Sequence, residues 1–273
     1  MTNFFLVLLA IGVILIPFLY RIIRTGKVSL FNTENDFGLD INYQKAEKVR
    51  IFQVIIVCLY LIYHSSIYWG WFNTLFFIIL VFFVSLFLEI LGVKTGYIFG
   101  GKYKYNHKLT PGPILFNIPL LIPVAWTFLL YLSFNLYCLI NQYEPEIIIK
   151  QQGVLFILPC LIIVFLDLVL DPIAVDEKRW EWEKKSMYYN VPILNFLGWF
   201  LTSLFILSVF STFAKPFEIE EVEGLKNKYI PGLLMIYIHL AASRPCFERK
   251  LKIPGFLAIF LSFLYIIKIL YIC

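Results

Sequence analysis

The chain has 273 residues, of which 60% are hydrophobic, 19% are aromatic and 15% are charged, and its mean hydropathy is +0.81. Soluble domains of this length carry about a quarter charged residues, so the composition excludes an ordinary soluble domain and indicates a membrane protein. The formal net charge of +5 would suit a nucleic-acid partner only if the basic residues formed one patch.

Apolar segments long enough to cross a bilayer recur along the whole chain. A spanning helix needs about 20 mostly apolar residues, and eight segments qualify or nearly qualify: 4–20, 51–68, 71–91, 114–140, 153–175, 192–213, 230–243 and 253–271. The first lacks a basic start and a small-residue cleavage site, so we interpret it as a retained span. The seventh is short and opens with Pro231-Gly232. We predict an all-α, polytopic membrane helix bundle that forms a single transmembrane domain over 1–273.

The basic residues alternate between successive loops. Loops after the first, third, fifth and seventh spans carry 18 of the 23 basic residues, whereas the opposite side carries Lys150, Lys215, Lys226 and Lys228 beside six glutamates. Because basic loops stay in the cytoplasm, we predict that the odd-numbered loops are cytoplasmic and that both termini lie outside the cell membrane. The net charge therefore reflects topology, and we expect no nucleic-acid partner.

Three acidic residues fall inside predicted spans. Glu89 lies near the end of the third span, and Asp167 and Asp171 lie near the end of the fifth, so all three are predicted at the cytoplasmic side. Carboxylates inside a membrane are costly and usually functional. Positions i and i+4 share a helix face, so the two aspartates can point together into the bundle. Two carboxyls that close cannot both ionise at low cost, which predicts a protonated acid beside a carboxylate.

A structural role for these acids is the alternative. They could pair with Lys178, Arg179 or a polar neighbour on another helix and only fix the packing of the bundle.

The two loops beside the acids, 89–113 and 171–199, are rich in aromatic residues. Aromatic side chains at a membrane interface ordinarily form an anchoring belt. Their density on one side, next to three acids, also fits a lined pocket whose rings can hold a cation. The residues that we expect in such a pocket are Tyr103, Tyr105, Trp180, Trp182, Tyr189, Asn195 and Trp199.

Other common site patterns do not occur. The sequence has no strand-borne GxGxxG, no GxxxxGK[ST], no GxSxG and no HExxH, and its three histidines and five cysteines are scattered. Nucleotide binding and covalent nucleophilic catalysis therefore have no support, and we expect no metal site.

Spaced residues between about 89 and 200 form a longer pattern. It consists of Glu89-x-x-Gly92-x-x-Thr95-Gly96-x-x-Phe99-Gly100-x-x-Tyr103-x-Tyr105, Pro119-x-x-x-Pro123-x-Ala125-Trp126-x-x-x-x-Tyr131, Asp167-x-x-x-Asp171-Pro172-x-Ala174-Val175, Trp180-x-Trp182, and Tyr188-Tyr189-x-Val191-Pro192-x-x-Asn195-Phe196-x-Gly198-Trp199. This pattern resembles the integral-membrane carotenoid biosynthesis family that contains the carotenoid 1,2-hydratases, such as bisanhydrobacterioruberin hydratases and the γ-carotene 1'-hydratase type. Asn190 departs from it, because a glycine is expected before Val191.

The resemblance implies an enzyme, a hydro-lyase that adds water across the terminal 1,2 double bond of an acyclic carotenoid end group without a cofactor. It implies that Asp167, Asp171 and Glu89 are catalytic, and it adds Trp126 and Tyr131 to the substrate-binding residues. The carotenoid would lie in the lipid bilayer with one end at the cytoplasmic interface. Association with other enzymes of carotenoid biosynthesis is a further implication.

Two other functions stay open at this point. The Asp167-x-x-x-Asp171 spacing also fits a membrane prenyltransferase that binds Mg²⁺ and a diphosphate, although such enzymes use two Asp-rich motifs and the sequence has one. A transporter or a non-catalytic carotenoid-binding protein is the second alternative, although the two halves show no convincing inverted repeat. Metal dependence tests the first alternative, and activity of the purified protein tests the second.

Overall fold

The computed structural model describes residues 2–25, 43–110, 112–143, 156–215 and 225–272. Within these ranges, seven helices are long and apolar enough to cross a membrane, so the chain is a multi-pass, all-α membrane protein, as predicted. The helices are α1 (Thr2–Thr25), α2 (Tyr43–Thr95), α3 (Leu121–Asn141), α5 (Ile157–Asp176), α6 (Ile193–Phe213), α7 (Ile230–Glu248) and α8 (Lys252–Ile272).

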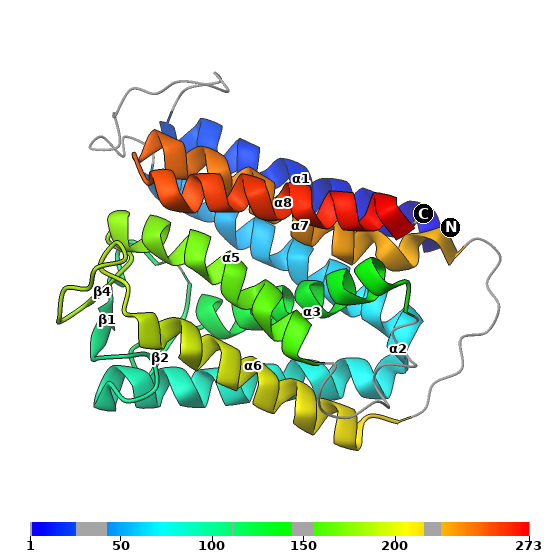
Figure 1. Ribbon diagram of the computed structural model, residues 1–273, viewed down its shortest axis with the longest axis horizontal. Helices are drawn as coiled ribbons and strands as arrows, with labels where there is room; N and C mark the ends of the chain where they lie inside the picture. The colour runs from blue at the N-terminus through cyan, green and yellow to red at the C-terminus, as the bar shows by residue number, and fades with distance from the viewer. Residues whose placement is uncertain (1, 26–42, 111, 144–155, 216–224, 273) are drawn as a thin grey trace.

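The second helix is two spans joined at a glycine. Gly70 has φ 76° and ψ 160°, a backbone conformation that only glycine adopts readily. Figure 1 shows the part of α2 beyond this point running back along the bundle, and Asn73 donates a hydrogen bond to the carbonyl of Lys215, just after α6 (2.8 Å). Each arm exceeds the about 20 residues that a span needs. The predicted spans 51–68 and 71–91 are therefore the two arms of α2, and the seven helices account for all eight predicted spans.

The helices form two layers. In Figure 1, α1, α7, α8 and the first arm of α2 lie above α6 and the second arm of α2, with α3 and α5 in the middle. The central helix, α3, is the most enclosed of the seven, because 78% of the residues in its most apolar stretch are buried. Both chain termini lie at the same end of the bundle, as an even number of crossings requires.

The opposite end of the bundle, which we call the basic end, is where α1 ends and α2 begins. Here Arg50 donates a hydrogen bond to Tyr20 (2.5 Å). Two short loop strands also lie at this end: β1 (Tyr103–Tyr105) pairs antiparallel with β4 (Trp180–Trp182). The predicted loops on the other side of the membrane fall largely on 144–155 and 216–224, outside the described residues.

One predicted boundary is wrong. The span predicted over 114–140 begins only at Leu121, because residues before it form a hairpin of β2 (Ile114–Leu115) and β3 (Ile118–Pro119). Phe116 and Asn117 turn the chain with φ 51° and 67°, the positive values that two-residue hairpin turns require. The short seventh span, in contrast, extends over Asn227–Glu248 and is long enough to cross.

The orientation of the bundle is testable with fusions. A reporter that works only outside the cytoplasm should be active when it is joined after Cys273, because the positive-inside rule predicts that the opposite, basic end of the bundle is cytoplasmic. The same reporter inserted in the loop 176–191 should be cytoplasmic. A cytoplasmic reporter after Cys273 would overturn the predicted topology.

Candidate active site

The two aspartates of α5 are held together by one side-chain amide. Asn195, on α6, donates one hydrogen bond to Asp167 Oδ2 (2.9 Å) and another to Asp171 Oδ2 (2.7 Å). All three side chains are buried. An amide nitrogen carries two hydrogens, so Asn195 gives both of them to this pair.

The shared amide also brings the two carboxyl groups close together, because the two Oδ2 atoms lie 2.9 Å and 2.7 Å from the same nitrogen. Two adjacent buried carboxyl groups cannot both carry a charge at low cost, so such a pair retains one proton. The predicted arrangement of the two aspartates on one helix face is therefore present, and it provides a proton donor next to a proton acceptor.

The third acid has a different environment. Glu89, near the end of α2, accepts hydrogen bonds from the hydroxyls of Tyr103 (2.5 Å) and Tyr105 (2.7 Å) and from the indole nitrogen of Trp126 (3.2 Å). Burial and the adjacent Glu89 raise the pKa of Tyr103 and Tyr105 well above the ordinary tyrosine range, so both hydroxyls stay protonated donors. Three donors aimed at one carboxyl group offset part of the cost of burying its charge.

The pairing of β1 with β4 places these tyrosines. Tyr103 lies opposite Trp182 and Tyr105 lies opposite Trp180, so side chains from two distant loops form one aromatic surface. The indole nitrogen of Trp182 also donates to the carbonyl of Phe99 (3.1 Å). On the other face of the strands, Lys104 pairs with Glu181 (2.9 Å) and is exposed to solvent.

These groups surround a cavity of about 130 Å³, which we call the acid cavity. The rings of Trp126 and Trp199 form a stacked pair, with centroids 3.6 Å apart and planes 11° apart. The acid cavity is lined by Glu89, Phe99, Tyr103, Tyr105, Ile122, Ala125, Trp126, Leu129, Ile163, Asp167, Leu170, Asp171, Trp180, Trp182, Asn195 and Trp199.

A proline sits in the helical turn that carries the aspartates. Pro172 has no N–H, so the carbonyl of Leu168 loses its usual helical partner. The hydroxyl of Tyr188 donates to that carbonyl instead (2.7 Å). The loop after β4 thus supports the backbone of α5 next to Asp171.

The structure gathers most of the predicted site residues but not all. Ten of the twelve line the acid cavity. Tyr131 does not: its hydroxyl contacts His64 Nδ1 (2.5 Å) and its ring packs against Trp69 in the core. Tyr189 also lies outside the lining, where its hydroxyl accepts a hydrogen bond from the backbone N–H of Ile253 (3.3 Å).

Sequence reasoning missed the aliphatic part of the wall, which comprises Ile122, Ala125, Leu129, Ile163 and Leu170. Aliphatic residues are common throughout apolar helices, so their chemistry does not mark them as part of a site. Ala125 stands in the sequence pattern quoted above, as does Phe99, a further lining residue that was not predicted, and this pattern was the available clue. Of the alternative partners for the acids, Arg179 makes none of the hydrogen bonds described to them and pairs with Glu177 (2.5 Å), whereas a polar neighbour on another helix is present, namely Asn195.

A glycine on α6 brings the loop of β1 close to the site. A Cβ atom on Gly198 would lie 2.5 Å from the carbonyl oxygen of Ile98 and 2.8 Å from the ring of Phe99.

Among the described residues, no group of three His, Cys, Asp or Glu side chains is close enough to hold a metal ion together.

These features define a class of protein: a multi-pass membrane helix bundle with a buried carboxyl cluster in an aromatic cavity. The chain belongs to the carotenoid biosynthesis protein family, whose model matches residues 47–265. The match extends well beyond the region of about 89–200 that carries the sequence pattern. Neither the curated proteins nor the solved structures compared with the chain gave a match.

The close approach at Gly198 yields a stability prediction. Gly198→Ala should lower stability by about 1–3 kcal/mol, because an added methyl must displace backbone or the ring of Phe99. Leu197→Ala, at an exposed neighbouring position, is the control and should change stability less. Thermal unfolding of the purified protein in detergent measures both, and equal midpoints would contradict the close contact.

Proposed function

We propose that this member of the carotenoid biosynthesis family is a hydratase that adds water to the terminal 1,2 double bond of an acyclic carotenoid. The observation that carries the proposal is the buried aspartate pair on Asn195, because two neighbouring carboxyl groups in an aromatic cavity can serve as the acid and the base. Hydration of an alkene requires both groups: an acid to protonate carbon and a base to take a proton from water.

The first step is proton transfer from the neutral member of the aspartate pair. The proton goes to the less substituted carbon of the double bond, which leaves a tertiary cation on the other carbon. Asn195 donates to both carboxyl groups, so it can stabilise the negative charge that the proton leaves behind.

The cation forms beside a fixed negative charge and aromatic rings. Glu89 already accepts three hydrogen bonds, so its role is a positioned anion rather than the proton donor. The faces of the cavity's tryptophans add to this stabilisation, by about 0.5–2 kcal/mol for a cation held over a ring. Charges and dipoles fixed in advance need no reorganisation when the cation appears.

Water then adds to the tertiary carbon, and the carboxylate of the pair takes its proton. The pair returns to its starting state with one proton, so the reaction needs no other reactant. The acid cavity, of about 130 Å³, suits one isoprenoid end group rather than a complete polyene. In this proposal the polyene extends into the bilayer and its end lies near the cytoplasmic interface.

Variants of the pair test the proposal. Asp167→Asn and Asp171→Asn should each reduce alcohol formation by about 10²–10⁴-fold, because an amide neither donates the proton nor carries the charge. The pigments of a host that makes lycopene and expresses each variant alone give the readout. Glu183→Gln, at an exposed position outside the cavity lining, is the control and should match the unaltered protein.

Near-normal hydration by both aspartate variants, with both proteins present in the membrane, would contradict the proposal. In that case the pair would serve helix packing only.

Glu89→Gln separates the roles of the acids. It keeps an acceptor for Tyr103 and Tyr105 but loses the charge, so it should slow hydration less than Asp171→Asn does. If Glu89→Gln proved as inactive as both aspartate variants, Glu89 would belong to the proton-transfer machinery itself.

Metal removal distinguishes the hydratase from a prenyltransferase. The purified protein should hydrate its substrate at an unchanged rate in EDTA, because the aspartate pair supplies both proton-transfer groups. Loss of activity that Mg²⁺ restores would favour the prenyltransferase.

A further inference from the structure

A second, larger cavity lies beside the acid cavity, and we call it the arginine cavity. Its volume is about 530 Å³, and α1, the first arm of α2, α3, α5 and α7 enclose it. Its charged lining residues are Arg21, Arg50, Glu177, Arg179, Arg244, Glu248 and Arg249. None of them has a role in the chemistry proposed above.

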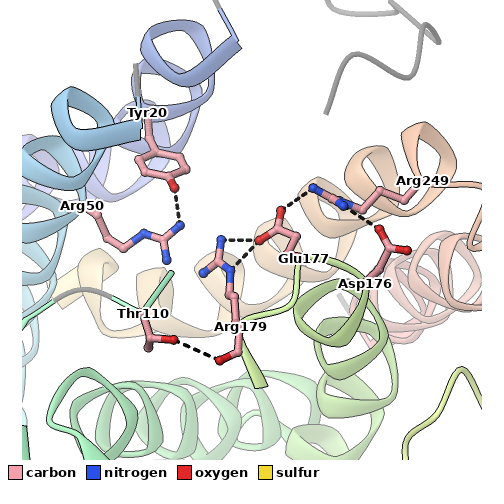
Figure 2. A network of polar contacts seen from close by, with 7 residues as sticks. All are labelled: Tyr20, Arg50, Thr110, Asp176, Glu177, Arg179 and Arg249. Atoms are coloured by element: carbon pink, nitrogen blue, oxygen red, sulfur yellow. Dashed lines mark hydrogen bonds and ion pairs between the residues drawn. The ribbon is translucent and has the colours of Figure 1, made fainter. Parts of the chain in front are cut away.

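The charged groups form ion pairs at the basic end of the bundle. Glu177 pairs with Arg179 (2.5 Å) and with Arg249 (2.8 Å), as Figure 2 shows. Glu248 pairs in the same way with Arg244 (3.0 Å) and with Arg21. Charged side chains next to a bilayer stay in contact with water or with partners of opposite charge.

The charged side chains at this end of the cavity leave room for water beside them. The side chains of Arg21, Arg179 and Arg244 are 20%, 21% and 21% exposed. Two neutral polar side chains, Gln53 and Thr110, continue the polar lining. The basic end of the arginine cavity therefore offers a polar recess for water, whereas apolar side chains form most of the remaining lining.

The two cavities share part of their walls. Five residues line both of them: Ile122, Ala125, Leu129, Leu170 and Trp180. Leu170 directly precedes Asp171 in α5. The ring of Trp180 packs against that of Tyr105, 5.7 Å between centroids, and Tyr105 in turn bonds Glu89. A wall of single side chains, mostly from α3 and α5, thus separates the arginine cavity from the acid cavity that holds the aspartate pair.

The backbone around Trp180 is anchored from the arginine cavity side. The carbonyl of Arg179 accepts hydrogen bonds from the backbone N–H of Asn106 (2.7 Å) and from the hydroxyl of Thr110 (3.2 Å). Figure 2 shows this second contact beside the Arg179–Glu177 pair. These two bonds fix the backbone from which Trp180 enters the shared wall, next to the residue that carries the ion pair with Glu177.

Hydration consumes one water in every turnover, so water must reach the acid cavity. Apart from the three acids, Asn195 and the tyrosine hydroxyls, the side chains that line this cavity are aromatic or aliphatic. We propose that the arginine cavity is the water reservoir of the acid cavity and that water passes through the shared wall at Leu170, Ala125 and Trp180. This inference rests on the proposed hydratase function. It assigns the ion-pair cluster to holding water beside the reaction.

Water supply determines which of two fates the tertiary cation meets. The cation can take up water, in which case the C–O bond forms and one proton of the water passes to the carboxylate. It can instead return a proton from carbon to the carboxylate, which restores the alkene. In deuterated water the first fate gives a deuterated alcohol, and the second gives recovered alkene that carries deuterium. The ratio of these products measures water supply separately from proton transfer.

Thiol labelling tests the hydration of the cavity without any reference to the reaction. Ala241 lines the arginine cavity about one helical turn from Arg244, whereas its neighbour Leu240 is exposed on the outside of the helix and absent from the lining. In detergent, Ala241→Cys should react with a charged methanethiosulfonate reagent above the wild-type level, because the thiolate forms only in water. Leu240→Cys is the matched control and should stay unreactive. Equal, background labelling of both would overturn the inference.

A bulky substitution tests the use of that water. Ala241 lines the arginine cavity alone, so Ala241→Trp takes up water space there and leaves every residue of the acid cavity lining unaltered in sequence. The ratio of deuterated alkene to alcohol should therefore rise about tenfold over wild type, a change of about 1.4 kcal/mol. Leu240→Trp is the control and should keep the wild-type ratio. An unchanged ratio in Ala241→Trp, or alcohol and exchange that fall together, would overturn the inference. If wild type forms neither product while Ala241→Cys is labelled, the proposed hydratase function fails and the hydrated cavity remains.

Discussion

The double hydrogen bond from Asn195 to Asp167 and Asp171 is the interaction on which the rest of the site depends. A buried charge without partners costs several kcal/mol, and two adjacent carboxyls in a membrane helix would be worse. One amide that donates to both (2.9 and 2.7 Å), with one retained proton between them, makes the pair tolerable. In the proposed hydratase, the same arrangement keeps an acid and a base side by side, so the contact that stabilises the pair would also serve the chemistry.

The fold brings the other parts of the site to this pair. The reversal of α2 at Gly70 returns its second arm to the basic end, where Glu89 meets the two tyrosines of β1. The pairing of β1 with β4 then closes the aromatic wall, and Tyr188 supports α5 at the carbonyl that Pro172 leaves without a helical partner. Acids in two different environments thus lie in one cavity: a pair that shares one amide donor, and a carboxyl group that accepts three hydrogen bonds.

Hydropathy and charge predicted the helical class, the spans and the shared helix face of Asp167 and Asp171, because lipid forces every span to be apolar and helical. The hairpin at 114–119 escaped prediction, since its apolar residues continue the pattern of the following helix. The β1–β4 pairing joins loops far apart in sequence, and nothing local specifies such a contact. Tyr131 was misplaced for a related reason: its contact with His64 depends on how α3 faces the first arm of α2. The arginines of the second cavity were visible only as loop charge.

The most direct measurement of the central claim is the source of the new oxygen. The purified protein, given an acyclic carotenoid in ¹⁸O-labelled water under ordinary air, should form a tertiary alcohol whose hydroxyl carries the label. Mass spectrometry of the product reads this directly, and unlabelled water under ¹⁸O₂ is the paired control. An alcohol labelled from oxygen gas, or no alcohol from purified active protein, would contradict hydration by the aspartate pair.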